Sequence, residues 1–506
     1  MTTEKILLFK PAPLFLIIVT VMIALSLSDK CIAQSASLYA GISEVDITPP
    51  IGYGQYRGPS TGIKDPLYAK AVVFQEGNEK AALVVCDVIG ITREFSTEVR
   101  LEVSQQTDIP YENIIVAATH THTGPVFHTD DGSVANNPDV GFPLEEYVNR
   151  KRAGELTEGD KVSYEALLLQ NVTRALKEAN DAMVQVYLES GSGKAEGLSF
   201  NRRFVMSDGR VRTNAGVRNP DIIRPAGPID PEVGIIMLRN ASDNKPLAGL
   251  INFANHTDTV GGTEYSADYP AYLAATLSAS LSDGFISIFA QGTSGDLNHV
   301  DVFGASHQEG PGTVTQQIGE TLASVVMAEK SNLKRSLQPQ LSVRSEIMYA
   351  PLQQYTEEEL RWAQQEERSP LYHQRSFLEY RRMLKIRSLQ KMQRTGEAIP
   401  PTSGTAPWTL PVEVQVFRIG EDTAIVGLPG EVFVELGLAI KEASPFETTL
   451  VIELTNRHIA YVPTEKAFAQ GGYETINSRL APGSGEMMVA LAIRLLNELN
   501  GELERQ

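Results

Sequence analysis

The stretch of sequence that says most about the fold is residues 113–125, NIIVAATHTHTGP. The apolar, β-branched first half of the stretch predicts a buried strand. Because successive side chains of a strand alternate between its faces, His120 and His122 are expected to point the same way at the strand's end. The Gly-Pro pair that follows ends the strand where a ligand can reach it. The pattern predicts either a metal or catalytic site or a pair of hydrogen-bonded structural histidines.

The segments around this strand alternate between predicted strands and predicted helices. Further strands are predicted at residues 40–50, 67–74, 81–88, 235–238, 247–253, 285–290, 412–419, 423–428 and 449–454. Helices are predicted at residues 92–107, 164–179, 269–281, directly after 429–430, and at 486–499. This order predicts an α/β fold of layered mixed β-sheets flanked by helices.

Two longer segments differ in composition from their surroundings. Residues 357–394 are charged, contain aromatic residues and no glycine, and predict two amphipathic helices within a solvated helical insertion at about 355–400. Residues 130–160 are rich in Gly, Asn and charge, and predict a loop beside the histidine pair. A long loop next to a site often serves as a lid.

The N-terminus predicts export. Lys5 and Lys10 precede the apolar run 14–27, which is short for a membrane span and typical of a signal peptide. We expect residues 1–33 to be the signal peptide, cleaved before Gln34, with a retained N-terminal membrane anchor as the alternative. The expected location is therefore secreted or periplasmic.

Cysteine content and net charge limit which classes of protein and partner fit this chain. Of the 2 cysteines, Cys31 would leave with the signal peptide, and Cys86 lies in an apolar run that predicts a buried structural thiol. No disulfide framework is expected, so a chain of 506 residues must rely on a large core. The 44 Lys and Arg against 62 Asp and Glu give a net charge of -18, which argues against a nucleic-acid partner.

Four further clusters of polar residues follow predicted strands. They lie at residues 255–257, 291–299, 428–431 and 456–464. Each also has an ordinary structural explanation. His256 could be hydrogen-bonded at a strand end, the glycine-rich 291–299 could be a plain turn, Glu431 could stabilise a helix N-terminus, and Tyr461 could be a core aromatic.

In their order along the chain, these clusters resemble the neutral, non-lysosomal ceramidase family of secreted or surface zinc amidases, which cleave the N-acyl bond of ceramide. The matching motifs are DITPP 46–50, DPLYA 65–69, ATHTHTGP 118–125, NHT 255–257, SADYP 266–270, GD 295–296, PGE 429–431 and NRHIAY 456–461. The resemblance implies one large catalytic domain over residues 38–506. It leaves no room for the C-terminal immunoglobulin-like domain of that family.

The resemblance also implies roles for particular residues. The zinc ligands that it implies are His120, His256, Glu431 and Tyr461. It makes His122 a proton-handling or substrate-contacting residue, and it matches Arg202 to an arginine that contacts substrate. Two imidazoles and one carboxylate would leave zinc an open position at which water is acidified. Tyr461 could instead donate a hydrogen bond to an oxyanion.

One position departs from the family pattern. After the Gly-Asp turn the family presents a serine followed by proline, where this chain has Asn298 and His299. A serine-dependent mechanism is therefore not expected, and Asn298 is expected to donate a hydrogen bond to a carbonyl or oxyanion. Asp268 and Asp296 are expected either to accept hydrogen bonds from ligand histidines or to cap a helix or turn.

The function expected from these observations is a secreted zinc-dependent hydrolase that cleaves an N-acyl amide bond with zinc-activated water. Its partner would be a small-molecule or lipid N-acyl substrate, with peripheral membrane contact left open and the oligomeric state not indicated. One alternative is a zinc esterase or deacetylase acting on a polar acylated metabolite or sugar. Another is a non-catalytic zinc-binding protein.

Overall fold

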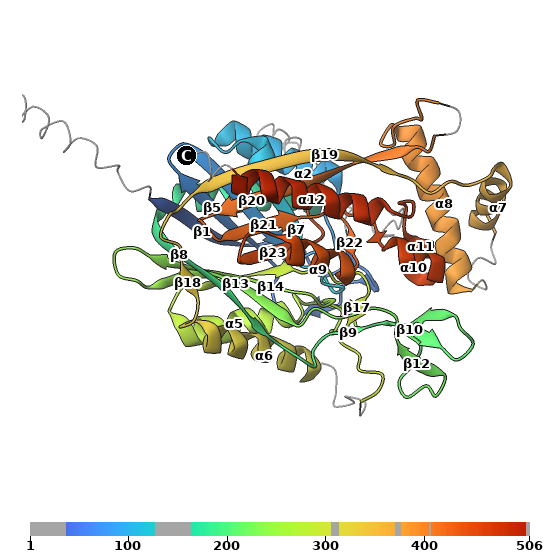
Figure 1. Ribbon diagram of the computed structural model, residues 1–506, viewed down its shortest axis with the longest axis horizontal. Coiled ribbons are helices and arrows are strands. Elements are labelled where there is room, and N and C mark those ends of the chain that lie inside the picture. The colour runs from blue at the N-terminus through green and yellow to red at the C-terminus, as the bar shows by residue number, and fades with distance from the viewer. Residues whose placement is uncertain (1–36, 127–162, 305–312, 370–375, 404–405, 502–506) are drawn as a thin grey trace, which may run out of the picture.

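The computed structural model describes residues 37–126, 163–304, 313–369, 376–403 and 406–501 (Figure 1). The predicted signal peptide and the predicted loop at 130–160 lie outside the described residues. Within the described ranges, no helix combines the length and the apolar character needed to span a membrane.

Two β-sheets form the centre of the molecule. The larger is a mixed, nine-stranded sheet in the order β16-β14-β13-β8-β1-β5-β6-β7, and β18 pairs with the middle of β8 outside this order. Its strands are β1 Leu38–Asp46, β5 Tyr68–Glu76, β6 Glu79–Cys86, β7 Ile114–Ala118, β8 Val184–Lys194, β13 Glu232–Asn240, β14 Pro246–Phe253, β16 Ile286–Gln291 and β18 Lys334–Arg335. The smaller sheet has the order β19-β20-β21-β23, made of Leu341–Pro351, Thr409–Ile419, Thr423–Gly427 and Thr448–Ile452.

The alternation of side chains along β7 explains how the layers are held together. Ile114, Val116 and Ala118 pack on the helical side of the larger sheet. Ile115 and Ala117 point the other way, into a core shared with β20, β21 and β23 of the smaller sheet. Both faces of the strand are therefore buried, as its unbroken apolar run predicts.

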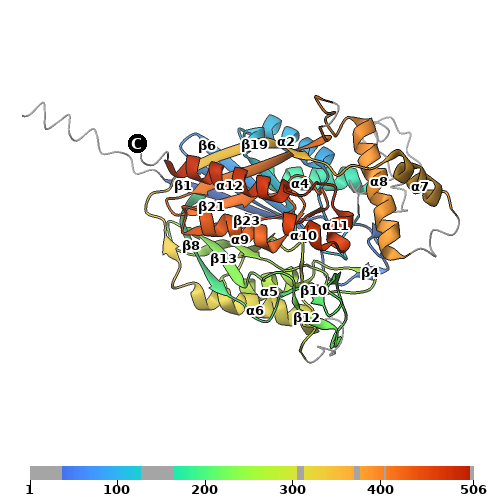
Figure 2. The same cartoon turned by 45° about the vertical axis from the view of Figure 1, so that its right-hand side comes forward.

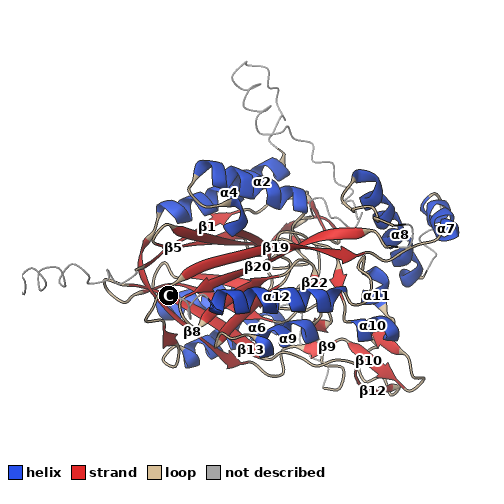
Figure 3. Ribbon diagram, turned by 45° about the horizontal axis from the view of Figure 1, so that its top comes forward, coloured by secondary structure: helices blue, strands red, loops and turns tan. Residues whose placement is uncertain are grey.

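Helices cover the outer face of each sheet (Figures 1 and 3). On the larger sheet these are α2 Arg93–Gln106, α4 Tyr164–Asp181, α5 Tyr269–Leu281 and α6 Thr313–Glu329. On the smaller sheet they are α9 Val434–Ala443 and α12 Ser484–Gly501. The result is a helix–sheet–sheet–helix sandwich, which confirms the predicted layered α/β fold.

Short elements surround the ends of the strands. They are the strands β2 Gly54–Gln55, β3 Gly58–Pro59, β4 Gly62–Ile63, β9 Phe200–Asn201, β10 Arg203–Met206, β11 Val211–Thr213, β12 Ile222–Pro225, β15 Glu264–Tyr265, β17 Leu297–Asn298, β22 Glu431–Val432 and β24 Tyr461–Val462, and the helices η1 Tyr111–Asn113, α10 Glu465–Gln470 and α11 Tyr473–Asn477. Several of them carry the residues of the candidate site.

The insertion predicted at about 355–400 contains the two expected helices, α7 Glu357–Glu367 and α8 Phe377–Thr395. Each begins with a capping box, in which Thr356 pairs with Glu359 and Ser376 with Glu379. Helix α8 ends at Gly396, whose φ of 80° is the left-handed conformation that glycine adopts most easily. These signals explain why a polar segment forms defined helices.

Most predicted elements are present with shifted ends, and Cys86 is fully buried as a free thiol. Strands β8 and β19, together with helix α6, were not predicted. Both strands carry several polar or exposed side chains, such as Glu189 and Glu346, so their apolar signal is weak. They are held instead by backbone pairing with neighbouring strands.

Candidate metal centre and substrate pocket

The residues singled out from the sequence come together where strands end. His120 and His122 follow β7, His256 follows β14, Glu431 follows β21, and Tyr461 follows β23. These strands run parallel to a neighbour in the β6–β7, β14–β16 and β21–β23 pairs. The larger sheet is also curled, so that its edge strands β16 and β7 approach each other. Carboxyl ends of parallel strands are a common place for a ligand site in α/β folds.

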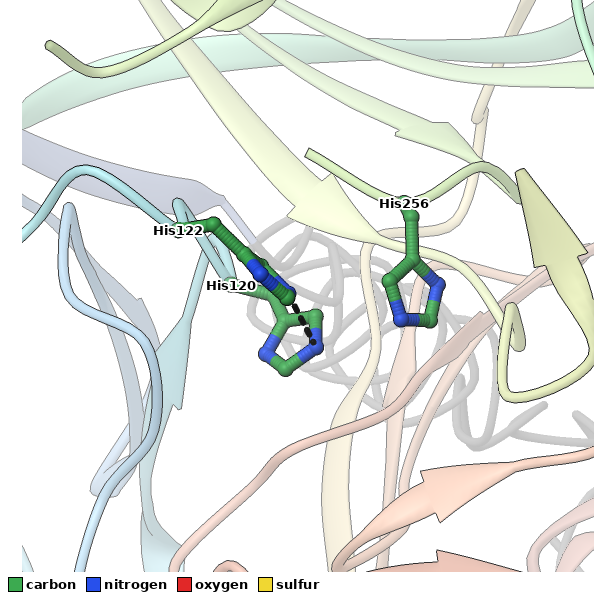
Figure 4. Close-up of side chains that lie close together, drawn as sticks. All are labelled: His120, His122 and His256. Carbon is green, nitrogen blue, oxygen red and sulfur yellow. Dashed lines mark hydrogen bonds between the residues drawn. The ribbon is translucent and has the colours of Figure 1, made fainter. Parts of the chain in front are cut away.

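His120 and His122 point toward the same centre, as expected, with their Nε2 atoms 3.4 Å apart (Figure 4). The physical reason differs from strand alternation. Strand β7 ends at Ala118, and His120 has a φ of 67°, in the left-handed region that non-glycine residues rarely adopt. A turn rather than a continuing strand therefore aims the two rings, and such strained conformations are often found at functional sites.

His120 and His256 are oriented by backbone carbonyls. His120 donates from Nδ1 to Ile89 O at 2.6 Å, and His256 donates from Nδ1 to Ser294 O at 3.0 Å. In the tautomer that these contacts require, Nε2 of each neutral ring carries a lone pair. The Nε2 atoms are therefore presented to the centre of the cluster, an arrangement typical of metal-ligating histidines.

Asp268 and Asp296 serve as caps, the second of the two roles expected for them. Asp268 is the N-cap of α5 and accepts hydrogen bonds from the backbone N–H of Tyr269 and Val260. Asp296 accepts from the backbone N–H of Val434 at the start of α9 and from the Asn201 side chain. The hydrogen bonds from the Nδ1 atoms of His120 and His256 go to backbone carbonyl oxygens and not to these two carboxylates.

Glu431 completes the cluster. Its Oε2 atom lies 3.5 Å from His120 Nε2 and 3.5 Å from His256 Nε2, and it is buried with no hydrogen-bond partner among the described residues. Burial opposes ionisation, but without a metal the attraction to a protonated His120 holds the pKa of Glu431 well below its usual value and raises the pKa of His120 in turn. A metal ion bound at His120 Nε2 would replace that proton. Glu431 lies in strand β22, and no side-chain hydrogen bond caps α9, so Glu431 does not cap that helix.

The donor atoms fit a tetrahedral metal ion. Two ligands about 2.1 Å from a tetrahedral zinc ion are about 3.4 Å from each other. The Glu431 Oε2 distances of 3.5 Å match this spacing. Within the described part of the chain, the ligand atoms of His120, His122 and His256 also lie within 4.8 Å of one another. Two donor sets can therefore hold an ion, one containing Glu431 and one containing His122.

Tyr461 lies beside Glu431, because β22 and β24 pair in parallel with these two residues opposite each other. Its ring packs against the Arg202 guanidinium, 5.4 Å from the ring centroid. Burial, reinforced by the charge of Glu431, raises the pKa of Tyr461 well above its usual value. In the absence of a metal the phenol is a protonated donor.

Arg202 and Asn298 are near the cluster but are engaged with protein atoms. Arg202 donates from Nε to Glu474 at 3.0 Å, and its Nη1 lies 3.1 Å from His256 Nε2. Asn298 donates from Nδ2 to Asn214 at 3.1 Å. Neither belongs to the described wall of the pocket that opens onto the metal-binding atoms.

That pocket encloses about 650 Å³, including its open mouth. Its base contains His120, His122, Glu431, His458 and Tyr461. The side walls combine apolar groups with polar ones, namely Ile89, Gly90, Ile91, Val126, Tyr56, Tyr473, Thr92, Arg381 and Asn477. A polar base below partly apolar walls suits an amphiphilic ligand.

His458 is a site residue that sequence reasoning did not select. Its Nε2 atom lies 3.1 Å from Glu431 Oε1, the carboxylate oxygen other than the one near His120 and His256. The signal was present, because His458 lies inside the NRHIAY motif, between the residues already noted. Nothing in the motif itself separates a histidine that faces the site from one that faces solvent.

A buried group of imidazoles and one carboxylate at the base of an open pocket defines the site as a candidate mononuclear metal centre. Residues 39–311 match the family model described as neutral/alkaline non-lysosomal ceramidase, N-terminal. The chain belongs to this family.

Individual relatives agree with the family model. The neutral ceramidase of Pseudomonas aeruginosa is 24% identical over 298 residues, which cover 56% of this chain and 40% of that protein. The crystal structure of neutral ceramidase from P. aeruginosa matches with a TM-score of 0.65 at 18% identity, covering 92% of this chain and 75% of the other. A structure described as ceramidase complexed with C2 gives a TM-score of 0.64 at 17% identity, covering 92% and 76%. At these identities the structural matches establish a shared fold.

Proposed function

We propose that this protein is an exported zinc-dependent hydrolase that cleaves the amide bond of an N-acyl compound. The observation that supports the proposal most directly is the buried Glu431 Oε2 atom, which lies 3.5 Å from two imidazole nitrogens and lacks a hydrogen-bond partner among the described residues. An orphaned buried carboxylate oxygen is costly unless an ion or donor satisfies it. Membership of the ceramidase family supports amide substrates.

In this proposal His120, His256 and Glu431 hold the metal, with Tyr461 next to it. These residues would hold a zinc ion, which would supply Lewis-acid chemistry toward water and the scissile carbonyl. His458 fixes the Glu431 carboxylate through Oε1. Arg202, itself held by Glu474, lies with Nη1 3.1 Å from His256 Nε2, and this contact would have to give way when that nitrogen binds the metal.

The proton transfers are assigned to groups at the base of the pocket. His122 is assigned the proton transfers because it lies at the base of the pocket, 3.4 Å from the metal-binding nitrogen of His120. Burial, followed by the neighbouring His120, lowers the pKa of His122 to about 3, so its imidazole is neutral, and the assignment rests on its position rather than on its basicity. The leaving amine must receive a proton when the C–N bond breaks, and His122 is placed to return it. Tyr461 donates its hydroxyl hydrogen bond to the oxyanion. Asn298 is left out of the proposal, because it is not part of the described wall of the pocket that holds the other groups.

A substrate panel with metal analysis tests the proposal. Purified protein would be assayed on an N-acyl sphingosine, an N-acyl amino acid and an acetylated sugar, before and after treatment with a chelator. We expect amide hydrolysis that the chelator abolishes and zinc restores, and that His120→Ala loses together with bound zinc. A metal-free His120→Ala protein that stays active would contradict the proposal. Turnover confined to the acetylated sugar would favour a deacetylase, and zinc binding without any turnover would favour a binding protein.

A further inference from the structure

A second buried glutamate, Glu453, lies next to the segments that carry the metal-binding residues. It follows strand β23, which lies beside β21 and helix α9 (Figure 2). Its side chain is fully buried. Glu453 is not among the described residues that line the substrate pocket, so its contacts are with the protein itself.

One oxygen of the Glu453 carboxyl group holds the segment that orients His256. Oε1 lies within hydrogen-bond distance of Ser294 Oγ, at 2.7 Å. The backbone carbonyl of the same serine accepts from His256 Nδ1 at 3.0 Å. Gln291 Nε2 also donates to Ser294 Oγ, at 2.8 Å. Two buried side chains therefore fix the residue from which His256 takes its orientation.

The other oxygen of the Glu453 carboxyl group holds the strand that carries Glu431. Oε2 accepts from the backbone N–H of Val432 at 2.6 Å. This N–H belongs to the peptide bond that joins Glu431 to Val432. The two segments also pair directly, because Gly295 N donates to Val432 O at 2.9 Å. One carboxyl group thus connects the backbone of Glu431 with the segment that orients His256.

The protonation of Glu453 suits this place beside a charged carboxylate. Burial raises the pKa of Glu453 well above its usual value, and the charge of Glu431 adds to the effect, although hydrogen bonds from Ser294 and Val432 oppose it. A protonated acid adds no second negative charge next to Glu431. A neutral amide can make the same contacts, because its oxygen accepts from an N–H and its NH2 group donates to a hydroxyl.

We propose that Glu453 is a positioning residue of the metal centre, which keeps His256 and Glu431 at the spacing that a single metal ion requires. That spacing is 3.5 Å between His256 Nε2 and Glu431 Oε2. The inference rests on the proposed metal-dependent hydrolysis and adds a residue to the support of that site. Each oxygen of Glu453 acts on a different segment, so removing the carboxyl group releases both.

Zinc titrations of two variants test the role of the hydrogen bonds. Glu453→Leu should weaken zinc binding about 10- to 100-fold, measured by competition with a chelator. Glu453→Gln should stay within about threefold of wild type, because an amide keeps both contacts. Unchanged zinc affinity in Glu453→Leu would overturn the inference. A loss in Glu453→Gln as large as in Glu453→Leu would overturn it too.

Glu189→Leu is the matched control for a general loss of stability. Glu189 is another buried glutamate with a partner at each oxygen, Arg239 at 2.6 Å and Arg335 at 2.8 Å. It lies opposite Arg335 of β18, and β18 is well separated from β22 (Figure 1). Glu189→Leu should leave zinc affinity unchanged. A zinc loss equal to that of Glu453→Leu would show that destabilisation alone accounts for the effect.

Ser294→Ala keeps the inference testable if Glu453→Leu does not fold. It removes the hydroxyl that Glu453 Oε1 contacts and leaves the backbone carbonyl that accepts from His256. Zinc affinity should fall about 3- to 10-fold, because the Val432 contact remains. Wild-type affinity in Ser294→Ala would contradict a connection from Glu453 to His256.

Crystals of the metal-free protein separate this inference from the proposed function. The quantity to compare is the distance from His256 Nε2 to Glu431 Oε2 in wild type and in Glu453→Leu, or in Ser294→Ala if the first does not fold. An increase of more than about 0.5 Å supports the positioning role even if the wild type binds no zinc, a result that would sink only the proposed function. An unchanged distance would overturn the positioning role.

Discussion

His458 holds Glu431 by one carboxylate oxygen while two other imidazoles face the second. The His458 Nε2 to Glu431 Oε1 distance is 3.1 Å, and Oε2 lies 3.5 Å from both His120 Nε2 and His256 Nε2. The two carboxylate oxygens of Glu431 therefore have different surroundings. One is fixed by a hydrogen bond, and the other is kept for the metal-binding centre.

Removing that support should weaken metal binding without abolishing it. His458→Ala should lower zinc affinity about 10- to 100-fold, the usual effect of losing a group that orients a metal ligand. His458→Gln, which keeps an N–H donor, should recover part of the affinity. Competition with a coloured chelator measures both. Unchanged affinity in His458→Ala would show that Glu431 is not held through this contact.

His122 distinguishes the two possible ligand sets. If it handles a proton, His122→Ala should keep about one zinc ion per chain and lose about 10²- to 10⁴-fold in kcat. Metal content and steady-state kinetics on the same preparation measure this. Loss of zinc from His122→Ala would assign the ion to three histidines instead of two histidines and Glu431.

Gly295 should be intolerant of a side chain because of its neighbour in space. A Cβ atom at Gly295 would lie 2.5 Å from the backbone oxygen of Glu431. Gly295→Ala must therefore displace β22, and we expect reduced zinc affinity and activity. Gly261→Ala is the control, because no atom lies within 4 Å of its Cβ position. Zinc titrations that do not differ between the two variants would contradict the predicted displacement.

The buried pair of Arg100 and Glu413 should stabilise the junction between the two sheets. Arg100 donates to both carboxylate oxygens, at 2.6 and 3.0 Å. Arg100→Met should cost about 3–5 kcal/mol in the free energy of unfolding, because it leaves Glu413 charged and largely buried. Arg174→Met, which removes an exposed pair with Glu178, should cost under about 1 kcal/mol.

The same pair predicts a dependence on pH. Burial alone would raise the pKa of Glu413, but Arg100 outweighs it and the pKa lies below the usual 4.5. A lowered folded-state pKa gives stability that is present above pH 4.5 and is lost as the pH falls through the folded value. The difference between wild type and Arg100→Met in urea unfolding should therefore be largest at pH 7 and narrow toward pH 3.5. A gap of constant size would indicate lost packing instead.

Apolar strands and the polar residues after them were predictable because each signal is local. The apolar run before His120 predicted one strand, and the similar run before His256 predicted another. Strand β19 was missed because its alternation includes charged residues, such as Arg344 and Glu346, that lie on a less buried part of its sheet. Its position depends on pairing with β20, which is distant in sequence.

The direction of the side chains after β23 could not be predicted. Asn456 and Ala460 have φ values of 56° and 61°, so the chain reverses twice around His458. Period-2 alternation does not hold through such turns. The conformations are stabilised by contacts with remote elements, such as the Asn456 side chain that accepts from Val116 N. For the same reason, the amphipathic pattern of residues 357–394 alone could not predict that Arg381 lines the pocket.

The most direct test of the central claim is an anomalous difference map, recorded at the zinc absorption edge on crystals of the zinc-loaded protein. The account predicts one strong peak at about 2.0–2.2 Å from His120 Nε2, His256 Nε2 and a Glu431 carboxylate oxygen. A zinc-loaded crystal with no peak among these atoms, or with its peak elsewhere in the molecule, would contradict it.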